Sequence, residues 1–310
     1  MSALLSVILP IFVLIGVGFT AVRTRYVPSS VVEALGAFVL NFALPAVILH
    51  ALLQQDLQRT LDWGYIFAYA AGSLIAFVAI LALFRLAMGK SLSHAAAAAL
   101  GASASNSGFV GFPVASLALG APALAALPLS MLVENIIIIP LALALGEAST
   151  QKGEGLRDIL SGTLRRLSRT PLIVAIFMGV VLSAAGVSLP QPLSTALKMM
   201  ADASVPCALF VVGGTLAGLK AGSIAGDIMA IVAGKLLLHP LAVGAGFLLA
   251  GDVPAELMAA GLILASSPML TVYPILGARL GHGGMCAAAL LIATTASFLT
   301  LIAVLGLVRP

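Results

Sequence analysis

Long apolar runs separated by short polar breaks extend along the whole chain. A helix needs about 20 mostly apolar residues to cross the hydrocarbon layer of a membrane, and most of these runs reach that length. Charge, proline and glycine delimit ten such segments, at residues 3–22, 34–53, 64–87, 93–119, 122–146, 171–187, 194–217, 226–250, 255–281 and 284–308. The pattern predicts an all-α integral membrane protein with ten transmembrane helices, spans 1 to 10 in chain order.

The composition agrees with a membrane as the main solvent. Apolar residues make up 61% of the chain and charged residues only 8%, whereas soluble domains carry about a quarter charged residues. The first segment has no basic region before it but is followed by Arg23 and Arg25, so we interpret it as a retained first span and not as a secretory signal. Cys207 and Cys286 both lie inside apolar segments, and no disulfide framework is indicated.

The basic residues predict the orientation, because cytoplasmic loops are enriched in Lys and Arg. Eleven of the fifteen follow odd-numbered spans: Arg23, Arg25, Arg85, Lys90, Lys152, Arg157, Arg165, Arg166, Arg169, Lys220 and Arg279. Both termini are therefore expected on the outer face of the membrane. The same asymmetry accounts for the net charge of +4, so the charge does not indicate nucleic-acid binding.

The longest polar stretch, residues 147–170, separates residues 1–146 from residues 171–310. Within it, leucines and isoleucines fall at helical spacing opposite arginines, a pattern typical of an amphipathic helix on the cytoplasmic membrane surface. A flexible connector that obeys the same charge rule also explains the stretch. Neither interpretation assigns chemistry to it.

The two halves of the chain repeat each other. A shift of 161 residues without a gap superposes five pairs: Pro10 on Pro171, Pro45 on Pro206, Pro113 on Pro274, Gly18 on Gly179 and Gly120 on Gly281. A repeat of five spans must enter the membrane from opposite sides in its two copies, so the topology is inverted. Inverted repeats with helices broken at matching places are typical of secondary transporters, whose binding sites lie at the breaks.

Spans 4 and 9 carry the matched breaks. The candidate substrate-binding residues are Ser105, Asn106, Ser107, Gly108 and Pro113 in span 4, and Ser266, Ser267, Pro268, Thr271, Tyr273 and Pro274 in span 9. Proline lacks an amide hydrogen and crowds the carbonyl four residues back, so backbone groups are freed at membrane depth and need partners. Polar side chains or a substrate supply them, and the second half-helix offers its positive dipole end to an anion. A pair of tolerated proline kinks is the alternative.

At these breaks the sequence resembles the auxin efflux carrier family of secondary transporters, which includes the plant PIN carriers and bacterial permeases for malonate and other carboxylates. Four stretches carry the resemblance, which covers essentially the whole chain: LPIFVLIGVG at 9–18, NFALP at 41–45, NSGFVGFP at 106–113 and SPMLTVYP at 267–274. The chain departs from the plant members in its short central linker and in having Ser267, not asparagine, opposite Asn106. These departures argue against plant-hormone transport.

The resemblance implies a fold like that of the bile-acid symporters and PIN carriers. Spans 1, 2, 6 and 7 would form a scaffold, often a homodimer, and spans 3–5 and 8–10 a moving transport domain. Spans 4 and 9 would cross at their prolines, and the substrate carboxylate would bind at the crossing, near Asn106 and residues 267–271. The family also implies the inner membrane of a bacterium.

Ionisable groups at membrane depth are costly, by a contested amount of about 2.5 kcal/mol or more, so each one is a functional candidate. Glu134, beside Asn135 in span 5, is interpreted as a proton site or as a structural hydrogen-bond partner. Asn41 and Asp202 each lie four residues before a repeat-related proline and are candidates for supporting the site. A carboxylate there can bind a proton that travels with the substrate. The alternative for Asp202 is a span-end residue near water.

Lys235 and His239 stand four residues apart in span 8 and share one helical face. Lys235 is expected to pair with Glu134 or to attract an anion, and a lysine that extends to the membrane surface is the alternative. The other histidines lie in separate segments without metal-ligand spacing and are interpreted as structural: His50, His94 and His282. No metal site, cofactor or nucleotide-binding glycine loop is predicted.

These features predict a secondary active transporter of a small organic anion, a mono- or dicarboxylate such as malonate. It would work by alternating access with an elevator-like movement, coupled to protons or to the membrane potential. The alternative is a sodium-coupled organic anion symporter of the bile-acid type, with a cation site from Glu134, Asn135 and Asn106. A membrane enzyme would need a convergent nucleophile and base, which the sequence does not show. A channel or sensor is the further alternative.

Overall fold

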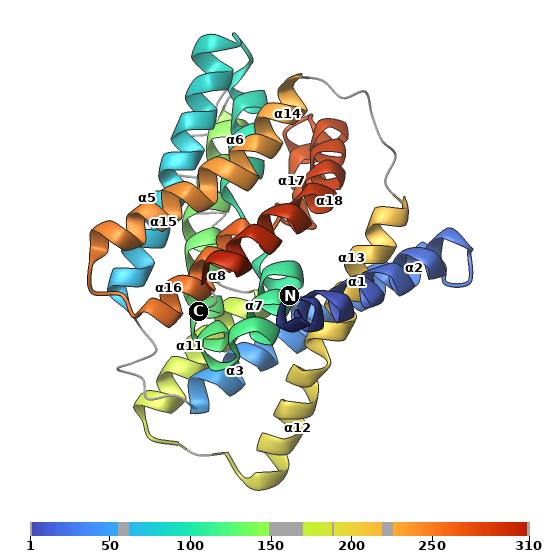
Figure 1. The fold of residues 1–310 in the computed structure, drawn as a ribbon, viewed down its shortest axis with the longest axis vertical. Coiled ribbons are helices and arrows are strands. Elements are labelled where there is room, and N and C mark those ends of the chain that lie inside the picture. The colour runs from blue at the N-terminus through green and yellow to red at the C-terminus, as the bar shows by residue number, and fades with distance from the viewer. Residues whose placement is uncertain (1, 55–61, 149–169, 188, 219–225, 309–310) are drawn as a thin grey trace.

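Helices form every regular element that the structure describes. The computed structural model describes residues 2–54, 62–148, 170–187, 189–218 and 226–308, and these ranges contain no strand. Figure 1 follows the chain from its blue N-terminus to its red C-terminus. The helices of the first half are α1 (Ser2–Arg23), α2 (Ser29–Phe38), η1 (Val39–Ala43), α3 (Leu44–Gln54), α5 (Trp63–Ala82), η2 (Leu83–Ala87), α6 (Leu92–Ser103), η3 (Ser107–Gly111), α7 (Phe112–Leu119), α8 (Ala121–Val133), η4 (Glu134–Ile138) and α9 (Ile139–Ala148). Those of the second half are α11 (Pro171–Ala184), α12 (Gln191–Asp202), α13 (Ser204–Gly218), α14 (Gly226–Ala233), η5 (Gly234–Leu238), α15 (His239–Ala250), α16 (Ala255–Ser266), α17 (Tyr273–Arg279) and α18 (Gly283–Val308).

The helices coincide with the predicted apolar segments. Among the described residues, six stretches are long and apolar enough to cross a membrane: Ser29–His50, Trp63–Ala87, Ala121–Gly146, Gln191–Ala217, Gly226–Ala250 and Gly283–Val308. Shorter apolar helices lie in the other predicted segments: Val13–Arg23, Ser107–Leu119, Pro171–Ala184 and Ala255–Ser266. The all-helical prediction is confirmed, whereas ten crossings stay a prediction. The predicted amphipathic linker at 147–170 lies almost wholly outside the described residues.

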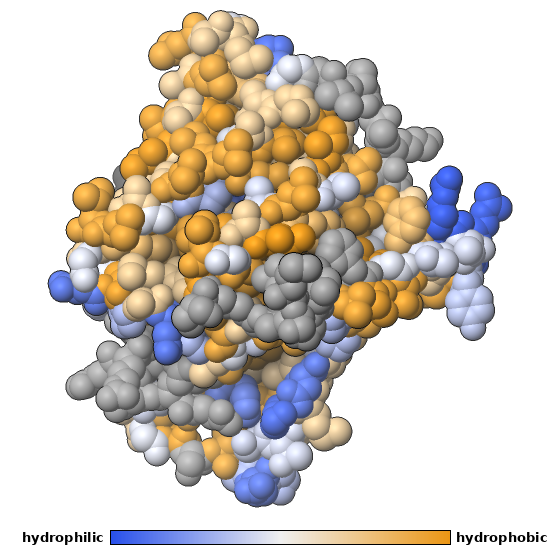
Figure 2. Space-filling model, viewed as in Figure 1, coloured by the Kyte–Doolittle hydropathy of each residue, from blue (hydrophilic) through white to orange (hydrophobic). Residues whose placement is uncertain are grey.

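The outer surface is apolar over broad areas. Figure 2 shows mostly hydrophobic residues on the viewed face over α15, α16 and α18, with hydrophilic residues gathered toward the margins. Leu248, Leu249 and Leu307 are 80%, 89% and 80% exposed. Water solvates such side chains poorly, whereas lipid tails accommodate them, so this surface suits a bilayer.

Proline widens four of the helices. Each of four π-helical stretches is followed, two residues after its end, by a proline: Pro45 after η1, Pro113 after η3, Pro140 after η4 and Pro240 after η5. The proline ring displaces the carbonyl four residues back and offers it no hydrogen, so the preceding turn widens. Such wide turns are frequent at functional sites. Four of the candidate residues, Asn41, Glu134, Asn135 and Lys235, lie within η1, η4 and η5.

Close helix pairs build the frame around the site. α1 packs against α13, and a Cβ on Gly18 would meet the backbone carbonyl of Phe210. α5 packs against α15 and α3 against α11. In Figure 1, α1, α2, α3, α11, α12 and α13 occupy the lower and right-hand part, and α5, α6, α14 and α15 the upper part. These groups meet at the broken helices.

The most completely buried helix is α6, in which residues 95–99 are all alanine with 0% exposure. These small side chains let α5, α9 and α14 pack closely around it. The helix ends in the first break, residues 104–106, before η3 begins. The second break, residues 267–272, separates α16 from α17.

Candidate functional site

The two broken helices meet at their breaks. Ser105 and Met269 form an isolated antiparallel bridge, and the Asn106 amide donates to the Pro268 carbonyl oxygen at 2.7 Å. Ser105 and Met269 are both fully buried. Backbone groups that each break frees inside the molecule therefore find partners in the other break, as groups without access to water must.

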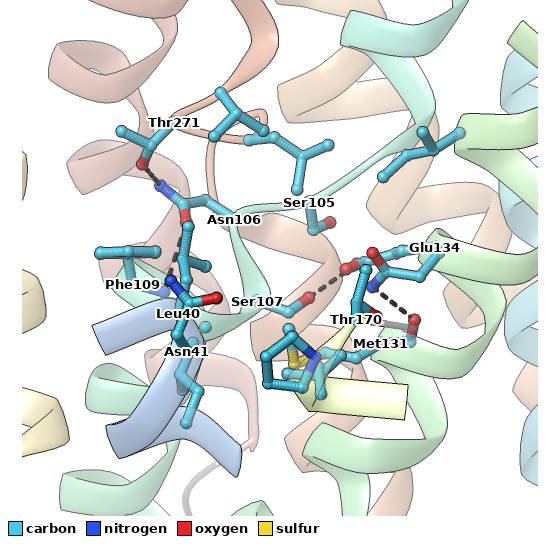
Figure 3. Close-up of a pocket in the computed structure, with 18 residues that line it drawn as sticks. Leu40, Asn41, Ser105, Asn106, Ser107, Phe109, Met131, Glu134, Thr170 and Thr271 are labelled. Atoms are coloured by element: carbon cyan, nitrogen blue, oxygen red, sulfur yellow. Dashed lines mark hydrogen bonds between the residues drawn. The ribbon is translucent and has the colours of Figure 1, made fainter. Parts of the chain in front are cut away.

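Asn106 ties the two breaks together. Its side-chain oxygen accepts from the Phe109 amide at 3.3 Å, which caps η3, and its side-chain nitrogen donates to Thr271 Oγ1 at 2.8 Å. Both bonds are visible in Figure 3. The amides of a first helical turn point out of the helix end, so an anion beside this cap meets a positive dipole.

A cavity of about 270 Å³ lies beside the crossing. Its polar lining consists of Asn41, Ser105, Asn106, Ser107, Glu134, Asn135, Thr170 and Thr271. Its apolar lining consists of Leu40, Leu44, Phe109, Met131, Ile139, Pro171, Leu172, Leu270 and Val272, with Gly108 between the two sets. Pockets for drug-sized ligands measure about 300 to 1,000 Å³, so this cavity suits a molecule of a few carbon atoms.

Glu134 reaches the cavity from η4, on the side opposite Asn106 (Figure 3). Its Oε1 accepts from Ser107 Oγ at 2.6 Å and from the Tyr69 hydroxyl at 3.0 Å. The side chain is 1% exposed. These donors replace water around the carboxyl group, since a buried polar group left unpaired costs about 1–3 kcal/mol.

Lys235 lies on the other side of the first break and does not line the cavity. Its fully buried ammonium donates to Ser105 Oγ at 2.6 Å and to the Ala265 carbonyl oxygen at 2.9 Å, and it lies 2.7 Å from His239 Nδ1. The expected direct pair with Glu134 does not form among the described residues. Ser105 accepts from Lys235, and Ser107, two residues further along the chain, donates to Glu134.

His239 extends the polar contacts of Lys235 away from the cavity. Its Nε2 lies 2.9 Å from Ser73 Oγ, and its Nδ1 lies 3.2 Å from the Ala265 carbonyl oxygen. The ring meets the Tyr69 ring edge-on, with centroids 6.0 Å apart. The structure thus brings the two predicted residues of span 8 together, and it connects them to the crossing through Ser105.

Three further candidates differ in their position. Asn41 and Asn135 line the cavity, and each donates at 2.8 Å to the carbonyl four residues back in its own helix. Asp202 ends α12, where its side chain is 61% exposed and accepts from Lys198 at 2.6 Å. Asp202 is therefore not brought to the cavity, and its position matches the span-end alternative.

The hydroxyl groups of span 9 mostly turn away from the cavity. Ser266 and Ser267 donate at 2.7 Å to carbonyl oxygens of their own helix, four and three residues back. The Tyr273 hydroxyl donates to the Ala97 carbonyl oxygen of α6 at 2.9 Å. Thr271 lines the cavity. The predicted prolines shape the breaks without lining the cavity: Pro113, Pro268 and Pro274.

Sequence reasoning missed a polar stripe on α5. Tyr65, Tyr69 and Ser73 are fully buried and face the crossing, and the Tyr65 hydroxyl lies 2.6 Å from Ser130 Oγ. Their spacing of four residues could have indicated the stripe, because residues four apart lie on one face of a helix. Thr170 was also missed, since it lies at the end of the polar stretch before α11.

A second cluster lies at the far end of α6. The His94 ring there contacts that of His282 in a tilted arrangement, with centroids 4.5 Å apart. His94 Nε2 lies 3.1 Å from Asp227 Oδ2, which also accepts from Lys90 at 2.7 Å. Burial lowers the pKa of His282, in the turn before α18, because desolvation disfavours the charged ring. Among the described residues, no group of three or more His, Cys, Asp or Glu is placed to hold a metal ion.

Comparison with known proteins gives one consistent result. Residues 3–305 match a family model described as "Membrane transport protein". A protein of Rhizobium meliloti (strain 1021), named "Putative malonate transporter", is 27% identical over 310 residues, which cover 100% of this chain and 97% of that protein. The "Uncharacterized transporter YfdV" of Escherichia coli (strain K12) is 26% identical over 244 residues, 76% of this chain and 75% of that protein.

Proposed function

The chain belongs to the membrane transport protein family, and from this we propose that it is a secondary active transporter of a small organic anion. The anion would be a mono- or dicarboxylate. The observation that carries the proposal is the cavity at the crossing, where Asn106 and Thr271 offer amide and hydroxyl groups beside the start of η3. Carboxylates accept hydrogen bonds from such groups, and broken helices in transporters direct their positive ends at anionic substrates.

Two observations support a small dicarboxylate such as malonate as substrate. The Rhizobium relative that matches this chain along its whole length has a name that refers to malonate. The cavity of about 270 Å³ is also small enough to favour a molecule of a few carbon atoms. The family and the relatives' names make the chain a membrane transporter and not an enzyme.

We further propose ten spans in two inverted repeats, residues 1–146 and 171–310, joined by a cytoplasmic linker at 147–170. Helix packing supports the repeat. A Cβ on Gly213 would meet α1, and a Cβ on Gly179 would meet Leu52 of α3. The shift of 161 relates residue 52 to residue 213 and residue 18 to residue 179. It therefore relates α1 to α11 and α3 to α13, so the packing of α1 on α13 corresponds to the packing of α11 on α3.

The proposed mechanism is an elevator-like movement with alternating access. The scaffold would be spans 1, 2, 6 and 7, and the transport domain spans 3–5 and 8–10. The cavity supports this division, since Asn41 and Leu172 line it from scaffold spans while Asn106 and Glu134 line it from the moving spans. Movement of one group past the other would expose the cavity to each side in turn. We propose a homodimer formed through the scaffold, in a bacterial inner membrane with both termini outside.

Protons or the membrane potential would drive the transport, and sodium is the alternative coupling ion. Glu134 is the ionisable side chain among the lining residues. Its carboxyl group already accepts bonds from Ser107 and Tyr69, which a sodium ion would have to displace. A proton needs no such displacement, so this arrangement favours symport with protons. Uptake that is unchanged when potassium replaces sodium would exclude the sodium alternative.

The test is uptake of radiolabelled malonate by proteoliposomes that contain the purified protein. Asn106→Ala is expected to lower uptake by about 10- to 100-fold, because it leaves buried partners unpaired at about 1–3 kcal/mol. Ser267→Ala is the matched control, with uptake within about twofold of wild type, since its hydroxyl bonds only within its own helix. If Asn106→Ala took up malonate as fast as wild type, the crossing would not be part of the binding site. Saturable exchange against internal malonate would distinguish a carrier from a channel.

A further inference from the structure

Lys235 holds a positive charge inside the molecule without a carboxylate partner. Its side chain is fully buried, and none of the ion pairs among the described residues includes it. A charged group at membrane depth is costly, so its presence there marks a functional candidate. The groups that surround its ammonium therefore bear on what Lys235 does.

Three uncharged acceptors surround the ammonium and form an acceptor cage of Ser105, Ala265 and His239. Lys235 Nζ donates to Ser105 Oγ at 2.6 Å and to the Ala265 carbonyl oxygen at 2.9 Å, and His239 Nδ1 lies 2.7 Å away. An ammonium has three hydrogens and no acceptor, so every hydrogen has a partner when Nδ1 accepts. His239 then carries its own hydrogen on Nε2, 2.9 Å from Ser73 Oγ, and is neutral. The cage thus holds one positive charge and no negative charge.

The acceptor cage draws on both broken helices and adjoins the cavity. Ser105 belongs to the first break, and Ala265 lies in α16, two residues before the second break. Ser105 also lines the cavity (Figure 3), so the residue that accepts from Lys235 is one that a substrate would meet. Hydrogen bonds in series polarise one another, so a hydroxyl group that accepts from a cation is a stronger donor. The charge of Lys235 therefore acts on the cavity across the first break.

On this geometry, and resting on the proposed transport of an organic anion, we infer that Lys235 determines specificity by favouring substrates with two negative charges over those with one. Lys235 does not line the cavity, so it acts at a distance and not by direct contact. Coulomb energy is proportional to the charge of the ligand, and it is weakly screened where water is excluded. A dicarboxylate therefore gains about twice the Coulomb energy that a monocarboxylate gains in the same place.

Glu134, which lines the cavity, does not remove this effect. Its carboxyl group accepts from Ser107 and Tyr69 and forms no ion pair with Lys235. When Glu134 is ionised, the two residues together are neutral, and when it is protonated, the positive charge remains. Loss of Lys235 makes the crossing more negative by one unit in either state. An anion should therefore bind less tightly without Lys235, whatever the protonation of Glu134.

The experiment compares the binding of malonate with that of malonamate, in which an amide replaces one carboxylate at nearly the same size. Dissociation constants are measured by calorimetry on the purified protein at about pH 8, where both carboxyl groups of malonate are ionised. Lys235→Gln keeps an amide donor for the acceptor cage but has no charge. It is expected to weaken malonate binding by about 50-fold and malonamate binding by about sevenfold, because the fold-change is squared when the ligand charge doubles. Lys235→Arg keeps the charge, so the ratio of the two constants should stay within about threefold of wild type.

Lys90→Gln is the matched control, because it removes the same charge at the far end of α6, where Lys90 pairs with Asp227. Both constants should stay within about twofold of wild type, since distant charges at a surface are screened. An effect as large as that of Lys235→Gln would overturn the assignment to Lys235. A second series of the same variants carries Glu134→Gln, so that a proton taken up by Glu134 cannot replace the lost charge.

A purely structural role of Lys235 would weaken the binding of both ligands by the same factor. That outcome in both series overturns the inference, as does unchanged binding. Lys235→Met is a second neutral variant in case Lys235→Gln does not fold. The wild-type protein itself should bind malonate at least about tenfold more tightly than malonamate, and equal affinities overturn the inference even if neither variant folds. If the wild type binds neither ligand, the proposed substrate class is wrong as well, whereas tight malonate binding with equal losses contradicts the role of Lys235 alone.

Discussion

The first break and the second break share a sequence pattern but differ in chemistry. In the first break, Ser105 and Asn106 direct their side chains to Lys235 and Thr271, and both line the cavity. In the second break, the neighbouring Ser267 bonds to its own helix, and the contacts across the crossing use the Thr271 hydroxyl and a backbone oxygen, that of Pro268. Asn106 of the first break donates both of these bonds, and the second break accepts them.

The lengths of the two breaks explain this difference. The first break holds only residues 104–106, so consecutive side chains lie close to the start of η3 and are aimed at its surroundings. The second break holds residues 267–272, a longer stretch in which Pro268 presents its carbonyl oxygen to the Asn106 amide. The repeated prolines therefore determine where the two helices break, whereas the residues within each break determine which side chains that break offers to the cavity.

The largest effect is expected from reversing the electrostatics of the first break with Asn106→Asp. Aspartate caps a helix as well as asparagine does, and it can accept from both Phe109 and Thr271, so the fold should persist. The added negative charge faces the same cavity as Glu134. Like charges at such short range cost several kcal/mol, so malonate uptake should fall by about 100-fold or more. Uptake in proteoliposomes measures this, with the melting temperature as a check on folding.

The same variant also tests the sign of the substrate's charge. If Asn106→Asp transported malonate as well as Asn106→Ala, the first break would not hold the anion. The two breaks would then have more similar roles than the structure indicates.

An intermediate effect, on stability, is expected where the second broken helix packs on the first. A Cβ on Gly101 of α6 would collide with the hydroxyl group of the buried Tyr273, which donates to the Ala97 carbonyl oxygen one turn earlier in α6. Gly101→Ala should therefore lower the free energy of unfolding by about 1–3 kcal/mol, the usual cost of overpacking. Thermal unfolding in detergent measures it.

Gly16→Ala in α1 is the control for that change, because no atom lies within 4 Å of the added Cβ. Alanine is favoured over glycine inside a helix by up to about 1 kcal/mol, so this variant should be at least as stable as wild type. If the two variants were equally stable, the contact between Gly101 of α6 and Tyr273 of α17 would have room for an added methyl group.

Much of the fold could be predicted from apolar runs and prolines, because both are local features of the sequence. The length of an apolar run predicts a membrane helix, and a proline interrupts the helix in which it lies. The segment boundaries agree with the helices. Charge at membrane depth singled out Glu134 and Lys235, and the position four residues before Pro45 singled out Asn41. Of the predicted site, Asn106, Ser107 and six other residues line the cavity: Asn41, Ser105, Gly108, Glu134, Asn135 and Thr271.

Side-chain direction was harder to predict. A serine near a helix end can bond to its own carbonyls three or four residues back, as Ser266 and Ser267 do, and sequence does not distinguish this from facing a ligand. The contacts of Tyr69 depend on its meeting Glu134 and His239 from other helices. Its position in an apolar run gave no sign of those partners.

The smallest effect is expected from Ser266→Ala. The shift of 161 relates Ser266 to Ser105, so the same change can be made once in each repeat. The Ser266 hydroxyl donates to the Leu262 carbonyl oxygen, which also belongs to the helical hydrogen-bond ladder, so its loss leaves no buried acceptor without a partner. Malonate uptake should stay within about twofold of wild type. Ser105→Ala removes one acceptor of the buried Lys235 ammonium and should reduce uptake further. Equal effects of the two changes would contradict the unequal roles of the breaks, because a hydroxyl group that bonds only within its helix would then matter as much as one that bonds across the crossing.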